Sequence, residues 1–189
     1  MGAELLLIRH APVAEPGRLM GRTDVAARVD PLVADRVRAW VGGVSLRRCS
    51  PALRCRQTFA ALWPDAAPKL DTRLWEQDFG DHDGLPFGDL PDLGVLSSAE
   101  LSAYAAPNGE SFDDLCARVW PALQDCASLA LQQNAPVAVV AHAGVVRAGL
   151  AMVLGAAPLG LAFEIAPLSV TRLRVGPDGP VSVIEVNRT

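Results

Sequence analysis

The 189-residue sequence has a single lysine, Lys69, so arginine supplies almost all of its positive charge, and the formal net charge is −4. A nucleic-acid-binding surface needs a basic stripe, and we therefore expect no nucleic-acid partner. A small basic pocket is compatible with this charge balance. Arginine is also the residue best suited to bidentate contact with phosphate.

Long hydrophobic runs are missing as well. The run Leu5–Ile8 between Glu4 and Arg9 is too short for the core of a signal peptide. The apolar stretch 148–163 is shorter than the roughly 20 residues of a membrane span, and glycine and proline interrupt it. We expect a cytoplasmic protein without a membrane partner.

Metal-binding spacings are absent from the sequence. Its cysteines form no Cys-x-x-Cys pair, and it has three histidines, so no pattern of metal ligands emerges. The residues concerned are Cys49, Cys55, Cys116, Cys126, His10, His82 and His142. We expect reduced, mostly buried thiols, no metal and no other cofactor. There is also no P-loop and no internal repeat.

Two continuous apolar runs predict strands buried on both faces, Leu5–Ile8 and Pro136–Ala141. Val44–Cys49 is a weaker strand candidate. The segments 168–175 and 181–186 flank Gly176-Pro-Asp-Gly179 and predict a hairpin at the end of the sequence.

Capping residues predict helices between these strands. Asp30-Pro31 and Ser50-Pro51 each place an N-cap before a first-turn proline. Ser111 with Asp114 indicates a capping box that opens a helix, and we expect Pro121 to kink it. A further helix is predicted over 145–154, with Gly155 as its stop.

The alternation of strands and helices predicts an α/β fold, a three-layer α/β/α sandwich around a mostly parallel mixed sheet. We expect residues 1–189 to form one domain. The stretch at about 80–108 is rich in Gly, Pro and Asp and lacks periodicity. Because it is too long for an ordinary loop, we interpret it as a lid-like or substrate-facing excursion.

Two of the three histidines, His10 and His142, directly follow the two clearest strands. Ligands of open α/β sheets bind outside the carboxyl ends of the strands. A single histidine at a strand end is more often a packed or surface residue, but two favour a site. Arg9 precedes His10, and both side chains can reach one pocket only if the chain turns at Ala11-Pro12.

Arg54 lies in the first turn of a predicted helix, where positive charge is disfavoured. A bound anion would offset that cost, and the alternative is a solvated surface arginine, as we expect for Arg47, Arg48 and Arg56. Phosphate-ester hydrolysis by histidine needs a neutral imidazole, several donors to the phosphoryl oxygens, and a carboxylic acid for the leaving group. Glu76 and Glu110 are the carboxyl candidates.

Five segments in order resemble the motifs of the histidine phosphatase superfamily, in its phosphoglycerate mutase-like branch. They are Leu7–Ala11, Ser50–Thr58, Leu74–Gly80, Asn108–Ser111 and Ala141–Arg147, and together they span most of residues 5–150. One such motif is weak evidence, whereas five in the same order are specific.

The resemblance implies a phosphoglycerate mutase-like fold and a role for each matching residue. His10 would attack phosphorus and form a phosphohistidine, and Glu76 would act as acid and then as base. The phosphoryl group would be bound by Arg9, Arg54, His142 and the adjacent Ala143. Arg22 and Thr23, in a loop similar to that after the family's first motif, would also approach phosphate.

Two titratable residues, Glu110 and His82, each have two alternative roles. Glu110 either contacts substrate or holds the loop before its helix. The segment 79–84, Phe-Gly-Asp-His-Asp-Gly, departs from the family pattern because it lacks an aromatic residue and a glutamate after Phe-Gly. His82 within it is either an additional base or, more often for a loop histidine, an exposed residue.

The resemblance implies a phosphatase that hydrolyses a small-molecule phosphate ester and releases inorganic phosphate. The compact chain favours hydrolysis over phosphoglycerate mutase activity. The segments 10–13, 21–24 and 76–80 most resemble bacterial alpha-ribazole phosphatases of cobalamin biosynthesis. A broad-specificity sugar-phosphate or nucleotide phosphatase is the alternative, and a phosphohistidine protein phosphatase fits less well. A non-catalytic phosphate-binding module is a different class, which the complete residue set argues against.

Overall fold

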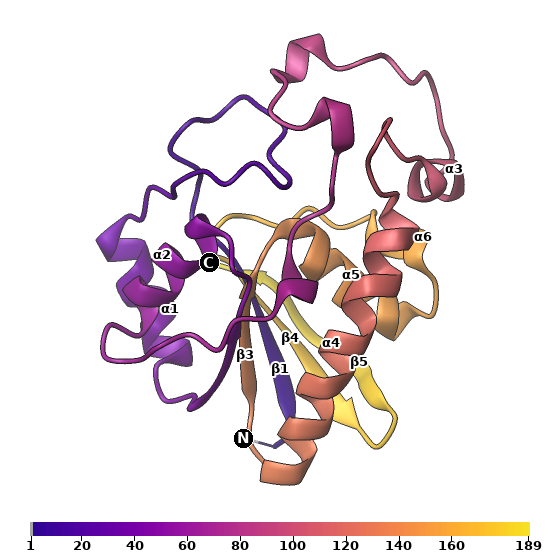
Figure 1. The fold of residues 1–189 in the computed structure, drawn as a ribbon. Coiled ribbons are helices and arrows are strands. Elements are labelled where there is room, and N and C mark those ends of the chain that lie inside the picture. Colours follow the sequence, from indigo (N-terminus) through magenta and orange to yellow (C-terminus); the bar gives the residue numbers. More distant parts are fainter. Residues whose placement is uncertain (1) are drawn as a thin grey trace.

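A mixed β-sheet lies at the centre of the structure, a computed structural model that describes residues 2–189 (Figure 1). The strands are β1 (Glu4–Arg9), β2 (Leu46–Cys49), β3 (Val137–Ala141), β4 (Val170–Gly176) and β5 (Gly179–Arg188). The α-helices are α1 (Pro31–Val41), α2 (Leu53–Leu62), α3 (Ser98–Ala103), α4 (Phe112–Gln133), α5 (Ala143–Leu154) and α6 (Ala157–Gly160). Short 3-10 turns are η1 (Thr72–Leu74), η2 (Gly80–His82) and η3 (Phe87–Asp89).

The strand order is β2-β3-β1-β4-β5. The strands β2, β3 and β1 run parallel, whereas β4 is antiparallel to β1 and forms the predicted hairpin with β5. In the register of β1 with β3, Arg9 lies opposite Ala141. The carboxyl ends of these two strands therefore meet, and the predicted α/β fold with a mostly parallel core is confirmed.

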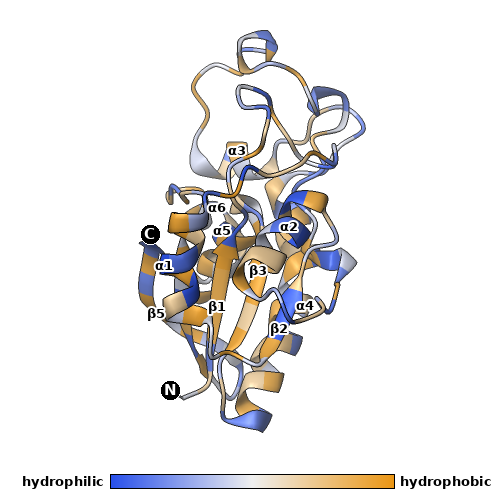
Figure 2. Cartoon of the chain, turned by 90° about the vertical axis from the view of Figure 1, so that its left-hand side faces the viewer, coloured by the Kyte–Doolittle hydropathy of each residue, from blue (hydrophilic) through white to orange (hydrophobic). Residues whose placement is uncertain are grey.

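Helices cover both faces of the sheet, because alternate residues of the apolar strands point to opposite sides. Leu5 and Leu7 pack in the core beneath α4 and α5, while Leu6 and Ile8 pack in the core beneath α1 and α2. Figure 2 shows the central strands as hydrophobic. Each fully buried leucine or isoleucine contributes about 1.5–3 kcal/mol, so β1 is firmly anchored and holds the residue after it in place.

Two of the predicted helix starts are confirmed. The Asp30 side chain accepts from Leu32 N at 2.9 Å with Pro31 in the first turn, and Ser111 and Asp114 form both bonds of a capping box. The helix α4 runs through Pro121 to Gln133. The helix expected after Ser50-Pro51 is present as α2, but its predicted cap is wrong, because the helix begins at Leu53 and its N-cap residue, Ala52, makes no side-chain hydrogen bond.

The segment between Gly80 and Asn108 leaves the sandwich and returns close to where it began. Gly80 adopts φ +50°, and a Cβ there would lie 2.1 Å from the Pro107 carbonyl oxygen and 2.5 Å from Gly109 N. The two ends of the excursion are therefore in direct contact, and the absence of a side chain permits it. Beyond η3, α3 packs near α6 and α4.

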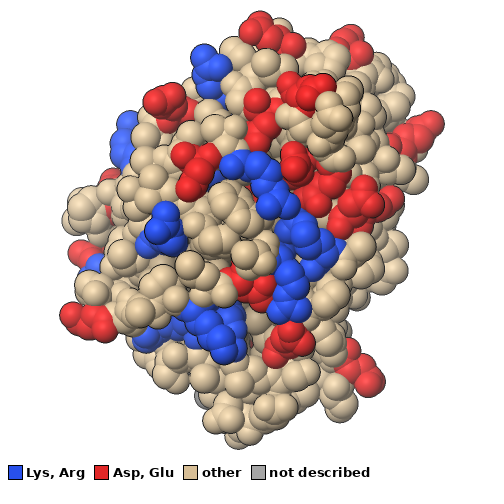
Figure 3. Space-filling view, viewed as in Figure 1, with Lys and Arg blue, Asp and Glu red and all other residues tan. Residues whose placement is uncertain are grey.

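The surface carries charges of both signs. Figure 3 shows basic side chains lying among acidic ones on the face viewed in Figure 1. Within residues 2–189, no helix is long and apolar enough to cross a membrane.

Candidate active site

Three parallel strands end side by side, and the residue after each carries a polar side chain. Ser50 follows β2, His142 follows β3 and His10 follows β1. Backbone bonds continue the sheet by one residue, from His10 N to Ala141 O at 2.9 Å and from Ser50 N to Val140 O at 2.9 Å. The sheet order thus places the three side chains in one row, and the rings of His10 and His142 lie 5.3 Å apart, edge to face.

His10 is buried, and its ring orientation is fixed by a backbone carbonyl. The Nδ1 atom lies 2.6 Å from Ala11 O. A carbonyl can only accept, so Nδ1 carries the proton and the neutral ring leaves its lone pair on Nε2. Burial lowers the pKa of His10 to about 3, and the charges of Arg54 and Arg9 act in the same direction against the raising effect of the Ala11 bond. The imidazole is therefore neutral at physiological pH.

His142 lies fully buried beside His10. Its Nε2 shares a 2.8 Å hydrogen bond with Ser50 Oγ, and its ring stacks on Trp75 with centroids 6.2 Å apart. The Cys55 Sγ atom is 3.5 Å from the same nitrogen. Burial, and then the charge of Arg54, hold the pKa of His142 well below its usual value. Ser50 therefore orients His142, and this accounts for its failure to cap α2.

Glu76 faces the amino-terminal end of α5. Its carboxylate oxygens accept from Gly144 N at 3.1 and 3.3 Å, and one of them also accepts from Gln77 N at 3.1 Å. A Cβ at Gly144 would lie 2.2 Å from Glu76 Oε1. The glycine therefore permits a close approach that brings the carboxylate to the helix amino terminus, where negative charge is stabilised.

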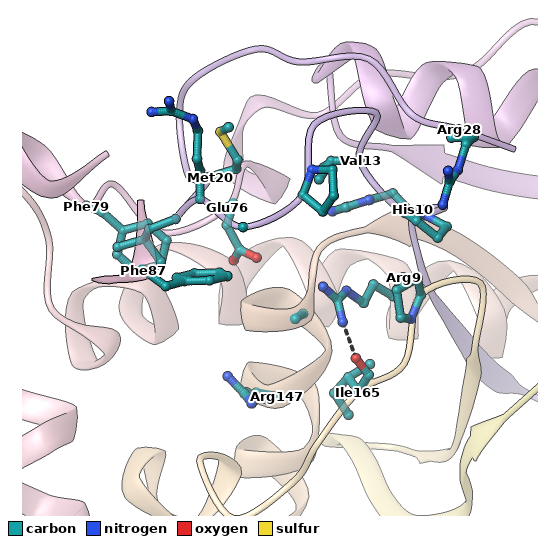
Figure 4. A pocket seen from close by; sticks show the side chains of 17 residues that line it. Arg9, His10, Val13, Met20, Arg28, Glu76, Phe79, Phe87, Arg147 and Ile165 are labelled. Carbon is teal, nitrogen blue, oxygen red and sulfur yellow. Dashed lines mark hydrogen bonds between the residues drawn. The ribbon is translucent and has the colours of Figure 1, made fainter. Parts of the chain in front are cut away.

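Arg9, His10, Glu76 and Ala143 line one cavity of about 480 Å³ (Figure 4). Arg9 Nη1 donates to the carbonyl oxygen of Ile165. Burial lowers the pKa of Arg9, while the Glu76 carboxylate partly offsets this. The remaining lining residues are Pro12, Val13, Pro16, Gly17, Arg18, Leu19, Met20, Arg28, Phe79, Phe87, Arg147, Ile165 and Pro167.

Arg54 is fully buried and lies outside the cavity lining. Its guanidinium donates to Gly21 O at 2.6 Å and to Thr23 O at 3.0 Å, which ties α2 to the loop after β1. Its Nε is buried without a hydrogen-bond partner in the described chain. Like His142, Arg54 is not among the residues that line the cavity, but its charge lies near enough to His10 to lower the pKa of that histidine.

Arg22 and Thr23, for which phosphate contact was expected, also do not line the cavity. Their backbone N–H groups and that of Gly21 donate to the Asp83 carboxylate at 2.7–2.8 Å. The Arg22 guanidinium lies 5.6 Å above the Trp75 ring. Asp83, in the segment that departs from the family pattern, thus joins the excursion to the loop after β1.

Glu110 makes contacts that hold its loop. Its carboxylate accepts from Asp78 N at 3.0 Å and pairs with Arg118, which also donates to backbone carbonyls of Arg73 and Trp75. Of the two roles left open by the sequence, loop holding is the one these contacts support. His82 is partly buried and does not line the cavity.

Sequence reasoning missed several residues of the site. Ser50 carried the usable signal, because it follows a predicted strand as His10 and His142 do. Arg147 was noted only as part of a motif, and Arg18 and Arg28 not at all, since only folding places them around the cavity. Among residues 2–189, no group of three or more His, Cys, Asp or Glu side chains is arranged to hold a metal ion.

Comparison with known proteins gives the family of this site. Residues 5–188 match the profile of the Histidine phosphatase superfamily (branch 1). The chain belongs to the histidine phosphatase superfamily. The resemblance of the five motifs is thereby confirmed at the level of this superfamily.

Solved structures of this superfamily share the fold over the whole chain. A mycobacterial glucosyl-3-phosphoglycerate phosphatase superposes with a TM-score of 0.83 at 23% identity, covering 100% of both chains. A Thermus thermophilus protein has a TM-score of 0.76 at 26% identity, covering 98% of this chain and 99% of its own. A phosphoserine phosphatase of Entamoeba histolytica has a TM-score of 0.82 at 21% identity, covering 97% and 96%.

A curated relative matches over part of its length. The Caenorhabditis elegans 6-phosphofructo-2-kinase/fructose-2,6-bisphosphatase is 32% identical over 107 residues, which are 54% of this chain and 22% of that protein. The three of these proteins that are named as phosphatases or bisphosphatases are named for different phosphate esters.

Proposed function

We propose that this phosphatase hydrolyses a small phosphorylated metabolite through a phosphohistidine on His10. The observation that carries the proposal is the state of His10. It is a neutral imidazole with Nδ1 bonded to Ala11 O, in one cavity with a guanidinium and a carboxyl group. Nε2 is thereby available as a nucleophile without prior deprotonation.

In the first step, His10 Nε2 forms a bond to phosphorus while the bond from phosphorus to the leaving oxygen breaks. Glu76, in its acid form, gives its proton to that oxygen. Arg9 balances charge on the phosphoryl oxygens during transfer. Because the Ala11 carbonyl keeps the proton on Nδ1, the ring that becomes positively charged is stabilised by an existing hydrogen bond.

In the second step, Glu76 as carboxylate takes a proton from water, whose oxygen attacks phosphorus. The phosphorus–nitrogen bond breaks, inorganic phosphate is released, and neutral His10 and the acid form of Glu76 are regenerated. The close approach of Gly144 to Glu76 fixes this carboxylate at the cavity wall for both steps.

Activity on a chromogenic aryl phosphate, without added metal, tests the nucleophile. His10→Ala should reduce kcat by several orders of magnitude and leave the fold intact. If His10→Ala hydrolyses the ester as fast as the wild type, His10 is not the nucleophile, and phosphate binding without catalysis becomes the better reading of the site.

The role of Glu76 is tested by the leaving group. Glu76→Gln should slow alkyl phosphates more than aryl phosphates, because an aryl oxide needs less protonation to depart. Rates on one aryl and one alkyl ester, measured side by side, give the comparison. Equal losses on both esters would remove Glu76 as the acid.

We propose two candidate classes for the substrate of this enzyme. Similarity of segments 10–13, 21–24 and 76–80 to alpha-ribazole phosphatases supports alpha-ribazole 5'-phosphate as one candidate, with sugar phosphates and nucleotides as the other. Hydrolysis across a panel that includes all three classes separates them. A clear preference for a glycolytic phosphoester would refute alpha-ribazole phosphate.

A further inference from the structure

The active-site cavity holds more positive charge than a single phosphoryl group balances. Four arginines line it, Arg9, Arg18, Arg28 and Arg147, against one carboxylate, Glu76. None of these arginines forms an ion pair with an acidic side chain in the described residues 2–189. Elsewhere in the structure, arginines such as Arg73 and Arg118 pair with neighbouring carboxylates.

Arg147 is the best-fixed of the three arginines that the proposed mechanism does not use. It lies on α5, just over one turn after His142, and is only partly exposed. Its Nε donates to Phe163 O at 2.8 Å, which anchors the guanidinium plane. Figure 4 shows Arg147 facing the same cavity as Arg9 and Glu76. Arg18 also donates to a backbone carbonyl, Gly84 O at 2.8 Å, but both Arg18 and Arg28 are exposed to solvent.

The anchoring leaves the two terminal nitrogens of Arg147 for a ligand. A guanidinium held at Nε presents a pair of N–H groups whose spacing matches two oxygens of a carboxylate or a phosphate. The positive charges of Arg147 and Arg9 are close enough to interact unfavourably, which contributes to the lowered pKa of Arg9 after burial. An anion between or beside them would relieve this repulsion.

A phosphoryl dianion at His10 would be balanced by the charges of Arg9 and of the buried Arg54, both of which act on His10. Arg147 would then still lack a counterion in a partly buried site. We propose that Arg147 forms a second anion subsite, which binds a carboxylate or a second phosphate carried by the leaving group of the substrate. The inference rests on the proposed function, because it assigns the leaving-group end of the same cavity.

Under this proposal the natural substrate is a phosphorylated acid or a bisphosphate, and neutral leaving groups react less well. Alpha-ribazole 5'-phosphate, whose leaving group is neutral, is disfavoured among the candidates above. The specificity is expressed in binding and positioning of the leaving group, so it should appear mainly in KM.

Matched substrates that differ in one anionic group provide the test. The first pair is 3-phosphoglycerate and glycerol 3-phosphate, and the second is fructose 1,6-bisphosphate and fructose 6-phosphate. The wild type should prefer the more anionic member of at least one pair by about tenfold or more in kcat/KM, equivalent to about 1.4 kcal/mol. The pair that shows the preference identifies a carboxylate or a phosphate as the bound group.

Arg147→Gln should abolish that preference. It should lower kcat/KM about tenfold for the member with the anionic leaving group, and leave kcat/KM within about twofold for the member with the neutral leaving group. Arg147→Lys keeps the charge without the paired donors and should retain part of the preference. Arg56→Gln, at an exposed arginine of α2 outside the cavity, is the control and should change neither substrate.

The outcomes separate this inference from the proposed function. If the wild type favours the members with neutral leaving groups, or alpha-ribazole 5'-phosphate, the second subsite is overturned while hydrolysis stands. The same holds if Arg147→Gln lowers kcat/KM equally for both members of a pair. If no phosphate ester is hydrolysed, the proposed function fails. Calorimetric binding of the same pairs then decides the subsite, and equal affinity within each pair overturns it.

Discussion

Burial of a neutral His10 should make the stability of the protein depend on pH in a way that one substitution isolates. The pKa of His10 is about 3 in the folded protein and 6.5 in an unfolded chain. Between these values the unfolded state binds a proton that the folded state does not, so lowering the pH favours unfolding. From about pH 7 to about pH 5, His10 alone should reduce the free energy of unfolding by about 2 kcal/mol.

Urea unfolding at the two pH values, for the wild type and for His10→Gln, measures this contribution. Carboxylates titrate in both proteins, so their effect cancels in the comparison. The wild type should lose about 2 kcal/mol more than the variant over this interval, a large part of the 5–15 kcal/mol typical of a folded protein. Equal losses in the two proteins would refute the buried, neutral state of His10 and with it the ready nucleophile.

Three further substitutions probe the surroundings of the site. Gly144→Ala should displace the Glu76 carboxylate, since the new Cβ would lie 2.2 Å from Oε1, and should slow alkyl phosphates about tenfold or more while the circular-dichroism spectrum is unchanged. Ser50→Ala removes the hydrogen bond to His142 and should lower the free energy of unfolding by about 1 kcal/mol and also lower kcat. Unfolding curves and steady-state rates that both match the wild type would contradict this. His82→Asn should leave kcat/KM within about twofold, because His82 lies outside the cavity, and a large loss would restore it as a base.

The core of the fold could be predicted because its signals are local. The continuous apolar runs of β1 and β3 can be buried only in a sheet covered on both faces. Asp30, Ser111 and Gly155 mark helix ends through bonds or backbone conformations within a few residues of themselves. The capping interpretation of Ser50 failed because its hydroxyl bonds a residue 92 positions away.

The same distinction applies to the site. The sequence by itself determined that His10 and His142 follow buried strands. Because the strand ends of a parallel sheet converge on one edge, this was enough to predict a shared site. The order of the motifs identified the superfamily. Only the tertiary structure decided that Glu76 lies against Gly144, that Asp83 binds the loop after β1, and that Arg147 shares the cavity. These contacts join segments far apart in the chain, and no local pattern of residues encodes a distance through space.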